Sequence, residues 1–341
     1  MFVRSKNNPI IKPNKKHSWE SRKTYNPGVV YHNKKYYVFY RAVGQNWKSF
    51  IGLAVSSDGE KFKRSDKPVF YPRAEFESRG VEDPRITKIK DKFLITYTAY
   101  DGKSARLKSA VSTDLKKWKK LGLMLPQWDI EKANGFLVNW DKAQQTKTAK
   151  KKWHKAGGIF PEKINKKYWM MFGDSNLWLA QSKDGIKWTP IWKPFIRPRK
   201  GRHFDNIHVE MGPPPIRTKK GWFVLYHGIN EKIEYKLGYL LLDIHDPTKI
   251  IYRSKKPIFE PKEPYEISGL VDILPGGFNA MKKLNKKELD EFIKKNEQIG
   301  RMPKVTFCNG ATLVNNKLEI FYGASDSVIC KAWTNFSHLF I

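Results

Sequence analysis

Cysteine is scarce in this sequence, with only two among 341 residues. Two thiols are too few for a disulfide scaffold, and Cys308 and Cys330 lack the paired spacing of a metal site. We expect both to be reduced thiols in the core, with a single bridge between them as the alternative. No metal ion is expected.

Long apolar runs are also missing. No stretch approaches the ~20 apolar residues that span a bilayer. The segment from Met1 to Lys15 carries positive charge but lacks the apolar centre of a signal peptide. We therefore expect a cytoplasmic protein with no membrane partner.

Acidic residues are outnumbered, with 33 Asp and Glu against 65 Lys and Arg, which gives a formal net charge of +32. Such an excess attracts polyanions. Most of the lysines, however, are spread through turns, as in residues 32–35 and 219–220. This pattern favours a solvated lysine-rich surface, and we expect no nucleic-acid partner.

Five copies of one pattern are present: a polar or lysine-rich turn followed by a short aromatic and β-branched run typical of a strand. The copies occupy residues 33–41, 91–98, 165–173, 220–227 and 316–323. Each copy has a strand-like segment before it (27–31, 84–89, 160–164, 214–218 and 311–314) and one after it (51–59, 106–115, 177–185, 235–243 and 328–336). Four units end in a further segment (67–72, 121–126, 192–198 and 256–261).

Five four-stranded units predict an all-β fold, and radial closure would protect their edges, as in a five-bladed β-propeller. The last unit lacks its fourth segment. Residues 4–13 resemble residues 64–72 and 253–261, so we expect the N-terminal strand to complete the last blade. The whole chain, 1–341, would form one domain. A two-sheet sandwich is the alternative.

One segment departs from the repeat. Residues 285–296 are highly charged, lack Gly and Pro, and place Leu289, Phe292 and Ile293 at helical spacing. This predicts a short helix in an insertion of about residues 282–300. It would serve as a lid over the central face or as a contact in a homo-oligomer.

Polar residues cluster where the inner strands begin, and several are carboxylates. There is no glycine-rich phosphate loop, HxxxH pair or GxSxG elbow. Two carboxyl groups across a sugar are the usual requirement for glycosidic cleavage. The candidate carboxylates are Asp83, Asp101, Glu210 and Asp243, and each has a structural alternative. Asp83, Asp101 and Asp243 could cap turns or strands, and Glu210 could be purely structural. His227 could be a satisfied strand residue.

An ordered set of motifs resembles glycoside hydrolase family 130. It consists of GVEDPRI (80–86), YTAYDG (97–102), FPEKI (160–164), GPPPIRTKKGWFVLYHG (212–228), LGYLLLDIHDPTKIIYRSKKPIFEP (237–261) and NGATLVNNKLEIFYGASDS (309–327). The resemblance implies a five-bladed fold and inverting action on β-D-mannosides. Most of the family are phosphorylases, and one branch consists of β-1,2-mannosidases. A mannose-containing oligosaccharide is therefore the expected partner.

The resemblance also assigns residues. Asp101 matches the family's general acid. Tyr100, Asp326, Arg41 and Asp83 resemble positions that line the mannose subsite, and we add Asn26, Arg85 and His227 as substrate-binding candidates.

The family's phosphate-binding positions are altered in this sequence. In the family, one basic residue that binds phosphate usually follows the third aromatic run, but this sequence has Phe172-Gly173 there, followed by Asp174. In a second family motif, His208 stands in place of a Lys and Glu210 in place of a Gly. Lys155 would survive as a third cation. A carboxylate repels phosphate but can deprotonate water. The arrangement Phe-Asp-x-x-x-Val-Glu-x-Gly-Pro-Pro, at residues 204–214, resembles the mannosidase branch of the family, and the resemblance implies a catalytic role for Glu210.

We therefore predict an inverting β-mannoside hydrolase with Asp101 as acid, Glu210 as base and Asp243 assisting the water. The first alternative is a phosphorylase that binds inorganic phosphate as co-substrate through Lys155 and His208. The second is a carbohydrate-binding protein without catalysis. No other cofactor is expected.

Overall fold

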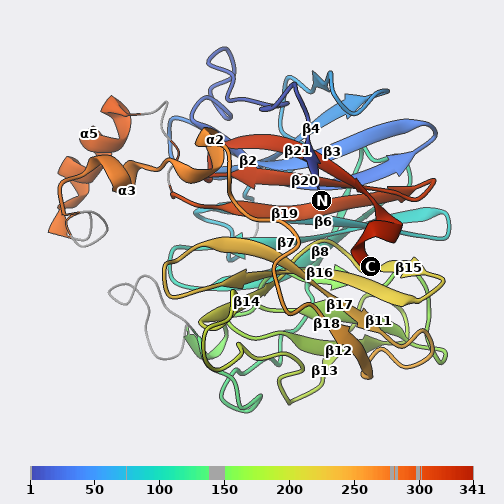
Figure 1. Cartoon of the computed structure of the whole chain (residues 1–341). Coiled ribbons are helices and arrows are strands. Elements are labelled where there is room, and N and C mark those ends of the chain that lie inside the picture. The colour runs from blue at the N-terminus through green and yellow to red at the C-terminus, as the bar shows by residue number, and fades with distance from the viewer. Residues whose placement is uncertain are drawn as a thin grey trace.

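The protein is built mainly of β-strands, with a few short helices (Figure 1). The computed structural model describes residues 2–73, 75–137, 150–276, 280, 283–296, 300 and 302–340. The predicted all-β class is confirmed.

The strands fall into five consecutive antiparallel groups. The first contains β2 (Lys23–His32), β3 (Lys35–Val43), β4 (Ser49–Ser56) and β5 (Lys63–Arg64). The second contains β6 (Gly80–Ile89), β7 (Lys92–Tyr100), β8 (Ala105–Ser112) and β9 (Lys119–Leu123). The third contains β10 (Gly157–Ile159), β11 (Tyr168–Phe172), β12 (Trp178–Ser182) and β13 (Thr189–Pro190). The fourth contains β14 (His208–Met211), β15 (Ile216–Thr218), β16 (Gly221–Ile229), β17 (Tyr235–Leu242) and β18 (Ile250–Arg253). The fifth contains β19 (Thr306–Val314), β20 (Lys317–Ala324) and β21 (Val328–Asn335), with β1 (Val3–Arg4).

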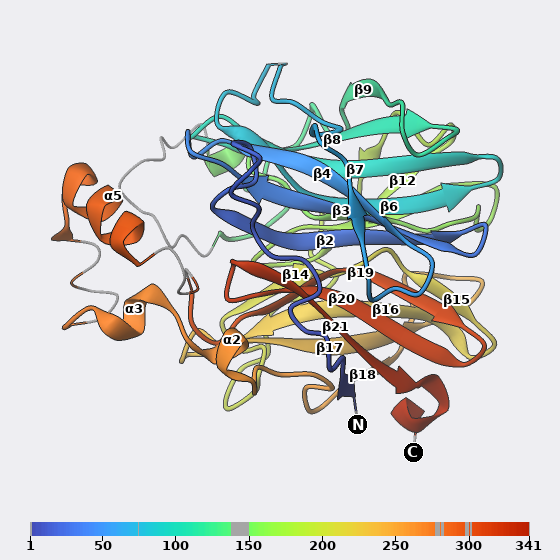
Figure 2. The same ribbon diagram turned by 90° about the horizontal axis from the view of Figure 1, so that it is seen from above.

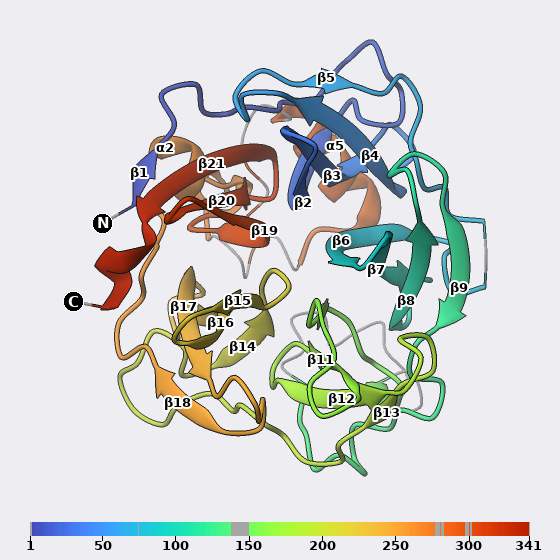
Figure 3. The ribbon, with the colours of Figure 1, turned by 90° about the vertical axis from the view of Figure 1, so that its right-hand side faces the viewer.

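These groups lie around a common centre (Figure 3). The first two are joined into one sheet by a single parallel bridge between Ser49 and Gly80. Strand β2 lies beside both β6 and β19, which links the first group to the second and to the fifth. Side chains from distant parts of the sequence therefore meet where the inner strands begin.

The strand predictions hold best for the aromatic runs and less well at the outer edge. Three of the segments expected as fourth strands contribute single bridges, such as that between Phe70 and Ile51, and the paired outer strands β5, β13 and β18 lie just ahead of them. The fourth, residues 121–126, overlaps β9 and pairs with β8 through Gly122 and Leu123. The inner strand expected at residues 160–164 is instead β10, because the chain turns at Pro161.

The N-terminal segment pairs with the last group of strands. Val3 lies opposite Trp333 and Arg4 opposite Ala332 on β21. Ile11 forms an isolated bridge to Ile329. Bridges of the same kind join Phe70 to Ile51 in the first group, Ile196 to Leu177 in the third and Phe259 to Leu237 in the fourth. Residues 3–11 thus fill the place that the outer segments fill elsewhere.

A tyrosine–carboxylate–cation cluster recurs in four of the groups. A tyrosine of the second long strand donates its hydroxyl to a buried carboxylate, which also binds a basic side chain of the outermost strand. The clusters are Tyr40–Glu20–Arg64, Tyr97–Glu77–Lys120, Tyr226–Asp205–Arg253 and Tyr322–Glu266–Arg4. In the third group Phe172 takes the tyrosine's place and packs its ring 5.0 Å from that of Trp128.

We expect replacement of Arg4 by Met to lower the free energy of unfolding by about 1–3 kcal/mol, because hydrogen bonds to charged groups contribute this much. Arg4 donates twice to Glu266, at 2.8 Å from Nε and 2.8 Å from Nη2, and Glu266 is fully buried. Urea denaturation measures the change. The exposed Lys6, changed to Met, is the control, and equal stabilities of the two variants would contradict the prediction.

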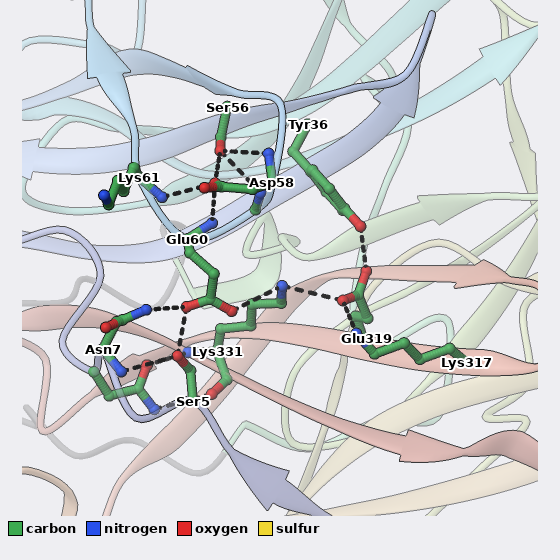
Figure 4. Close-up of polar contacts among 12 residues, drawn as sticks. Ser5, Asn7, Tyr36, Ser56, Asp58, Glu60, Lys61, Lys317, Glu319 and Lys331 are labelled. Carbon is green, nitrogen blue, oxygen red and sulfur yellow. Dashed lines mark hydrogen bonds and ion pairs between the residues drawn. The ribbon is translucent and has the colours of Figure 1, made fainter.

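A second buried ionic network lies between the first and last groups (Figure 4). The Lys331 ammonium lies 3.0 Å from Glu319 and 3.2 Å from Glu60, and the Tyr36 hydroxyl donates to Glu319 at 2.6 Å. Glu60 also accepts hydrogen bonds from Ser5 and Asn7. The network therefore ties the N-terminal segment to both neighbouring groups.

Two helices, α3 (Leu270–Ile273) and α5 (Lys286–Lys295), form an appendage at one side of the strands (Figure 2). Helix α2 (Pro264–Ile267) lies against the strands, where its Glu266 binds Tyr322 and Arg4, and a short 3-10 helix, η1 (Phe336–Phe340), follows β21. Asn285 caps α5 by accepting from the Glu288 amide, so the helix predicted within 285–296 is confirmed. Residues 282 and 297–299 of the expected insertion lie outside the described residues.

Two further expectations concern thiols and membranes. Cys308 and Cys330 are both free and buried, so the expectation of reduced core thiols is confirmed. Among the described residues, no helix has the length and apolar character needed to cross a bilayer.

Candidate active site

Three inner strands share an irregularity that builds the centre of the site. The pairing register shifts between Tyr25 and Gly28, between Glu82 and Arg85, and at Cys308–Gly310. Asn26 and Asp83 occupy the left-handed region at these bulges, with φ of 49° and 52°. The Asn26 amide donates to the Asp83 carboxylate at 2.8 Å, so equivalent positions of two groups meet.

Arg41 connects the carboxylates of the first and second groups. Its guanidinium lies 2.6 Å from Glu82 and 3.5 Å from Asp83 and packs over the Tyr25 ring at 4.8 Å. Ser49 donates to Glu82 at 3.0 Å. Burial raises the pKa of Glu82, and Arg41 opposes that shift. Arg41 and Asp83 thus meet as expected.

Lys155 lies between two buried carboxylates. Its ammonium is 2.9 Å from Glu210 and 3.8 Å from Asp174. The Trp153 indole donates to both oxygens of Asp174 at 3.1 Å. Glu210 and Asp174 are 2 % and 6 % exposed, so the three charges interact in a region of low dielectric.

The two carboxylates next to Lys155 differ in their affinity for a proton. Burial alone would raise the pKa of Glu210, but Lys155 and His208 lower it below its ordinary value. Burial raises the pKa of Asp174, and Glu210 adds to that rise while Lys155 opposes it. Glu210 is therefore the ionised partner of Lys155 in this structure.

Two histidines of the fourth group, His208 and His227, lie in this cluster, and a backbone amide donates to Nε2 of each. The Cys308 amide donates to His227 Nε2 at 2.8 Å, and the His227 ring stacks on Phe307 at 4.1 Å. The Ser175 amide donates to His208 Nε2 at 3.3 Å, and the same nitrogen lies 3.5 Å from Glu210. The His227 Nε2 accepts the hydrogen bond from the Cys308 amide and so carries no proton, and burial lowers the pKa of His227, so this ring adds no positive charge.

We expect stability to fall as the pH drops from 6.5 toward 4. Burial lowers the pKa of His227 to about 3 and that of His154 to about 4, from 6.5. The unfolded chain takes up protons that the folded protein does not, so the free energy of unfolding rises with pH across this window. Two such groups give a slope of about 2–3 kcal/mol per pH unit near pH 5.

Urea denaturation at pH 7, 6 and 5 measures this slope. A His154→Asn variant should retain about half of it, because only His227 then contributes. Equal stability of the wild type at pH 6 and pH 5 would contradict the prediction.

Tyr100, Asp101 and Asp326 lie near this cluster: Tyr100 ends β7, Asp101 follows it, and Asp326 lies in the turn between β20 and β21. The Tyr100 ring is 6.4 Å from that of Trp153, which binds Asp174. Asp101 follows Tyr100, and its carboxylate accepts from the amides of Lys103 and Ser104 at 2.8 and 2.7 Å. Asp326 lies close enough to Arg41 to raise its pKa, although burial and Glu82 have larger effects.

Two predicted site residues serve the fold in this structure. Arg85 is 1 % exposed, and its guanidinium donates to the carbonyls of Gly212, Asp83 and Met211 at 2.7, 3.0 and 2.6 Å. It joins β6 to β14, and these bonds occupy all three of its nitrogens. The expectation that Arg85 binds substrate is corrected accordingly.

Asp243 is not brought to the cluster. It follows Leu242, at the end of β17 opposite Tyr235, and its carboxylate accepts from the amides of His245 and Asp246. This is the capping role considered as its alternative. Because Asp243 lies at the end of β17 opposite Tyr235, and Tyr235 lies close to Glu210, the expectation that Asp243 helps to activate the water is corrected.

Sequence reasoning missed Glu82, Asp174 and Trp153 as site residues. Glu82 stands beside Asp83 in GVEDPRI, so an acidic pair at an inner-strand start was a usable signal. Asp174 and Trp153 carry no such signal, because their importance depends on contacts with Lys155 and with each other.

These features define a carboxylate-lined site on an all-β fold, and comparison with known proteins identifies its family. The family model of glycoside hydrolase family 130, described as beta-1,4-mannooligosaccharide phosphorylase, matches residues 3–286. The chain belongs to this family. A beta-1,2-mannobiose phosphorylase of Thermoanaerobacter sp. (strain X514) is 32% identical over 345 residues, covering 96% of this chain and 95% of that protein.

Solved structures agree with this assignment. A glycosyl hydrolase from Bacteroides ovatus is 29% identical, with a TM-score of 0.77 over 98% of this chain and 94% of that one. Another structure is described among family 130 glycoside hydrolases that target beta-1,2 mannosidic linkages in Candida mannan. It is 29% identical, with a TM-score of 0.76 over 98% of this chain and 94% of that one. The chain is thus related to phosphorylases and to hydrolases.

Proposed function

We propose that the protein hydrolyses β-mannosidic linkages, with β-1,2-mannosides as its substrates. The observation that carries the proposal is the ion pair of Lys155 with Glu210 at 2.9 Å. The cation available for phosphate is already neutralised, and Asp174 adds a second carboxylate 3.8 Å away. A dianionic phosphate needs charge-assisted donors, whereas a water needs a base.

In this proposal Glu210 is the base and Asp101 the acid. Asp101 lies on the loop after Tyr100, at the same end of the strands as the Glu210 cluster. Asn26, Arg41, Asp83 and Asp326 would bind the mannosyl group, because hydroxyl groups pair well with amide, guanidinium and carboxylate groups. Inversion follows if the water attacks from the face opposite the leaving group.

We also infer that the five groups of strands are the blades of a propeller closed by the N-terminal segment. The pairing of β1 with β21 and the Arg4–Glu266 contact support this inference. Closure would hold the inner-strand bulges at fixed positions around the site.

Incubation of the protein with β-1,2-mannobiose, with and without phosphate, tests the proposal. Hydrolysis releases mannose at the same rate in both reactions. Formation of mannose 1-phosphate only when phosphate is present would overturn it.

Phosphorolysis is the second candidate, and the curated relative favours it. The protein from Thermoanaerobacter sp. that is 32% identical over nearly the whole chain is a phosphorylase. In this case phosphate would displace Glu210 from Lys155 and approach His208. The same assay distinguishes the two candidates by the product.

A further inference from the structure

The Lys155–Glu210 ion pair presents a conflict with the proposed chemistry. A base must have a free lone pair directed at the water, but Glu210 Oε1 faces the Lys155 ammonium at 2.9 Å. The contact also lowers the pKa of Glu210, after the opposing effect of burial, and weakens it as a base. The ion pair between Lys155 and Glu210 must therefore break when substrate is bound.

Asp174 is placed to accept the Lys155 ammonium in place of Glu210. Its Oδ2 lies 3.8 Å from the same ammonium, so a displacement on the order of 1 Å brings Lys155 to hydrogen-bonding distance. The Trp153 indole fixes the Asp174 carboxylate through both oxygens. The second partner is therefore already in position, and only the lysine needs to move.

The lysine is anchored at its backbone while its side chain can rotate. The Gly173 amide donates to the Lys155 carbonyl at 2.9 Å, and Ala156 continues the chain in the left-handed region. The Lys155 side chain is 20% exposed, unlike the two carboxylates. A flexible four-carbon stem suits an ammonium that changes partner.

We propose that Lys155 exchanges partners, leaving Glu210 for Asp174 when a mannoside fills the site, and that Asp174 is a positioning residue for the base. This rests on the proposed hydrolysis. Glu210 Oε1 then takes one proton from the attacking water as its oxygen bonds to the anomeric carbon. The glycosidic bond breaks, and Asp101 protonates the leaving oxygen.

Charge is conserved through this step. Glu210 ends neutral and Asp101 ionised, and Lys155 stays paired with Asp174 until the product leaves. Exchange of one proton with water then resets both carboxyl groups. The charged and titratable groups that face Glu210 are Lys155 ahead of β10, Asp174 after β11, Arg85 of β6, His227 of β16, Tyr235 of β17 and His208 of its own strand.

Asp174→Asn tests the exchange, because asparagine retains an acceptor for Trp153 but removes the charge. Lys155 should then remain on Glu210, and kcat should fall about 10–100-fold with KM changed less than about threefold. Asp91→Asn, an exposed turn residue, is the matched control and should behave as the wild type.

A double variant separates this role from a structural one. Adding Lys155→Met to Asp174→Asn removes the trapped ammonium, so part of the lost kcat should return. Lys155→Met alone should move the acid limb of the kcat/KM–pH profile, which reports the free enzyme, upward by about one unit or more, because Glu210 loses its cation. Melting temperatures show which variants remain folded.

A kcat within twofold of the wild type in folded Asp174→Asn would overturn the exchange, as would a double variant no faster than Asp174→Asn. If Asp174→Asn does not fold, a structure of the wild type with mannose bound decides. Lys155 closer to Asp174 than to Glu210 supports the exchange, and the reverse overturns it. If mannose release is independent of phosphate and Asp174→Asn is as active as the wild type, only the partner exchange is wrong. If product forms only when phosphate is present, the proposed hydrolysis is wrong.

Discussion

Replacement of Glu210 by Gln is expected to reduce mannose release about 10²–10⁴-fold, the usual contribution of a general base. The amide keeps the size of the side chain but cannot accept a proton from water. KM should change far less than kcat, since Glu210 acts on the water in this mechanism. Initial rates of mannose release from β-1,2-mannobiose measure the effect.

Glu162→Gln is the matched control. Glu162 is half-exposed and pairs with Arg217 at 2.7 Å on the surface. Its loss should leave kcat within error of the wild type, because exposed ion pairs contribute little. Full activity in folded Glu210→Gln would exclude Glu210 as the base.

Replacement of Arg85 by Met should lower the free energy of unfolding by about 3–5 kcal/mol, because three buried carbonyls lose their donor. These carbonyls belong to Asp83, Met211 and Gly212. Since Met211 follows Glu210, activity should fall as well. Urea denaturation followed by tryptophan fluorescence measures the change in stability.

Arg217→Met serves as the control for Arg85→Met. The Arg217 side chain is 58% exposed, and its substitution should change stability by less than about 0.5 kcal/mol. If the two arginine variants unfold at the same urea concentration, the structural role assigned to Arg85 is wrong.

The strands could be predicted because the signal for each is local. Residues 316–323, for example, combine an Asn-Lys turn with a short apolar and aromatic run, and this run lies in β20 (Lys317–Ala324). The same reasoning placed three of the four outer strands too late, because the prolines in segments such as 256–261 favour single bridges over ladders.

The candidate site could be predicted in part: Arg41 and Asp83 were placed together from the sequence, and their side chains lie 3.5 Å apart in the structure. It was not predictable where a role depends on the partner. Arg85 was predicted to bind substrate, yet two of its three partners are carbonyls more than 120 residues away, in β14 and just after it. Lys155 looked like a phosphate ligand, but folding places Glu210, 55 positions later, against its ammonium.

The pairing of β1 with β21 has a consequence for synthesis of the chain. Val3 and its partner Trp333 are 330 positions apart, so the first strand emerges from the ribosome long before its neighbour exists. At about 5–20 residues per second this delay lasts roughly 17–66 s. Until then the exposed edge of the nascent chain is open to other strands, and a chaperone that shields this edge would favour the correct pairing of β1 with β21.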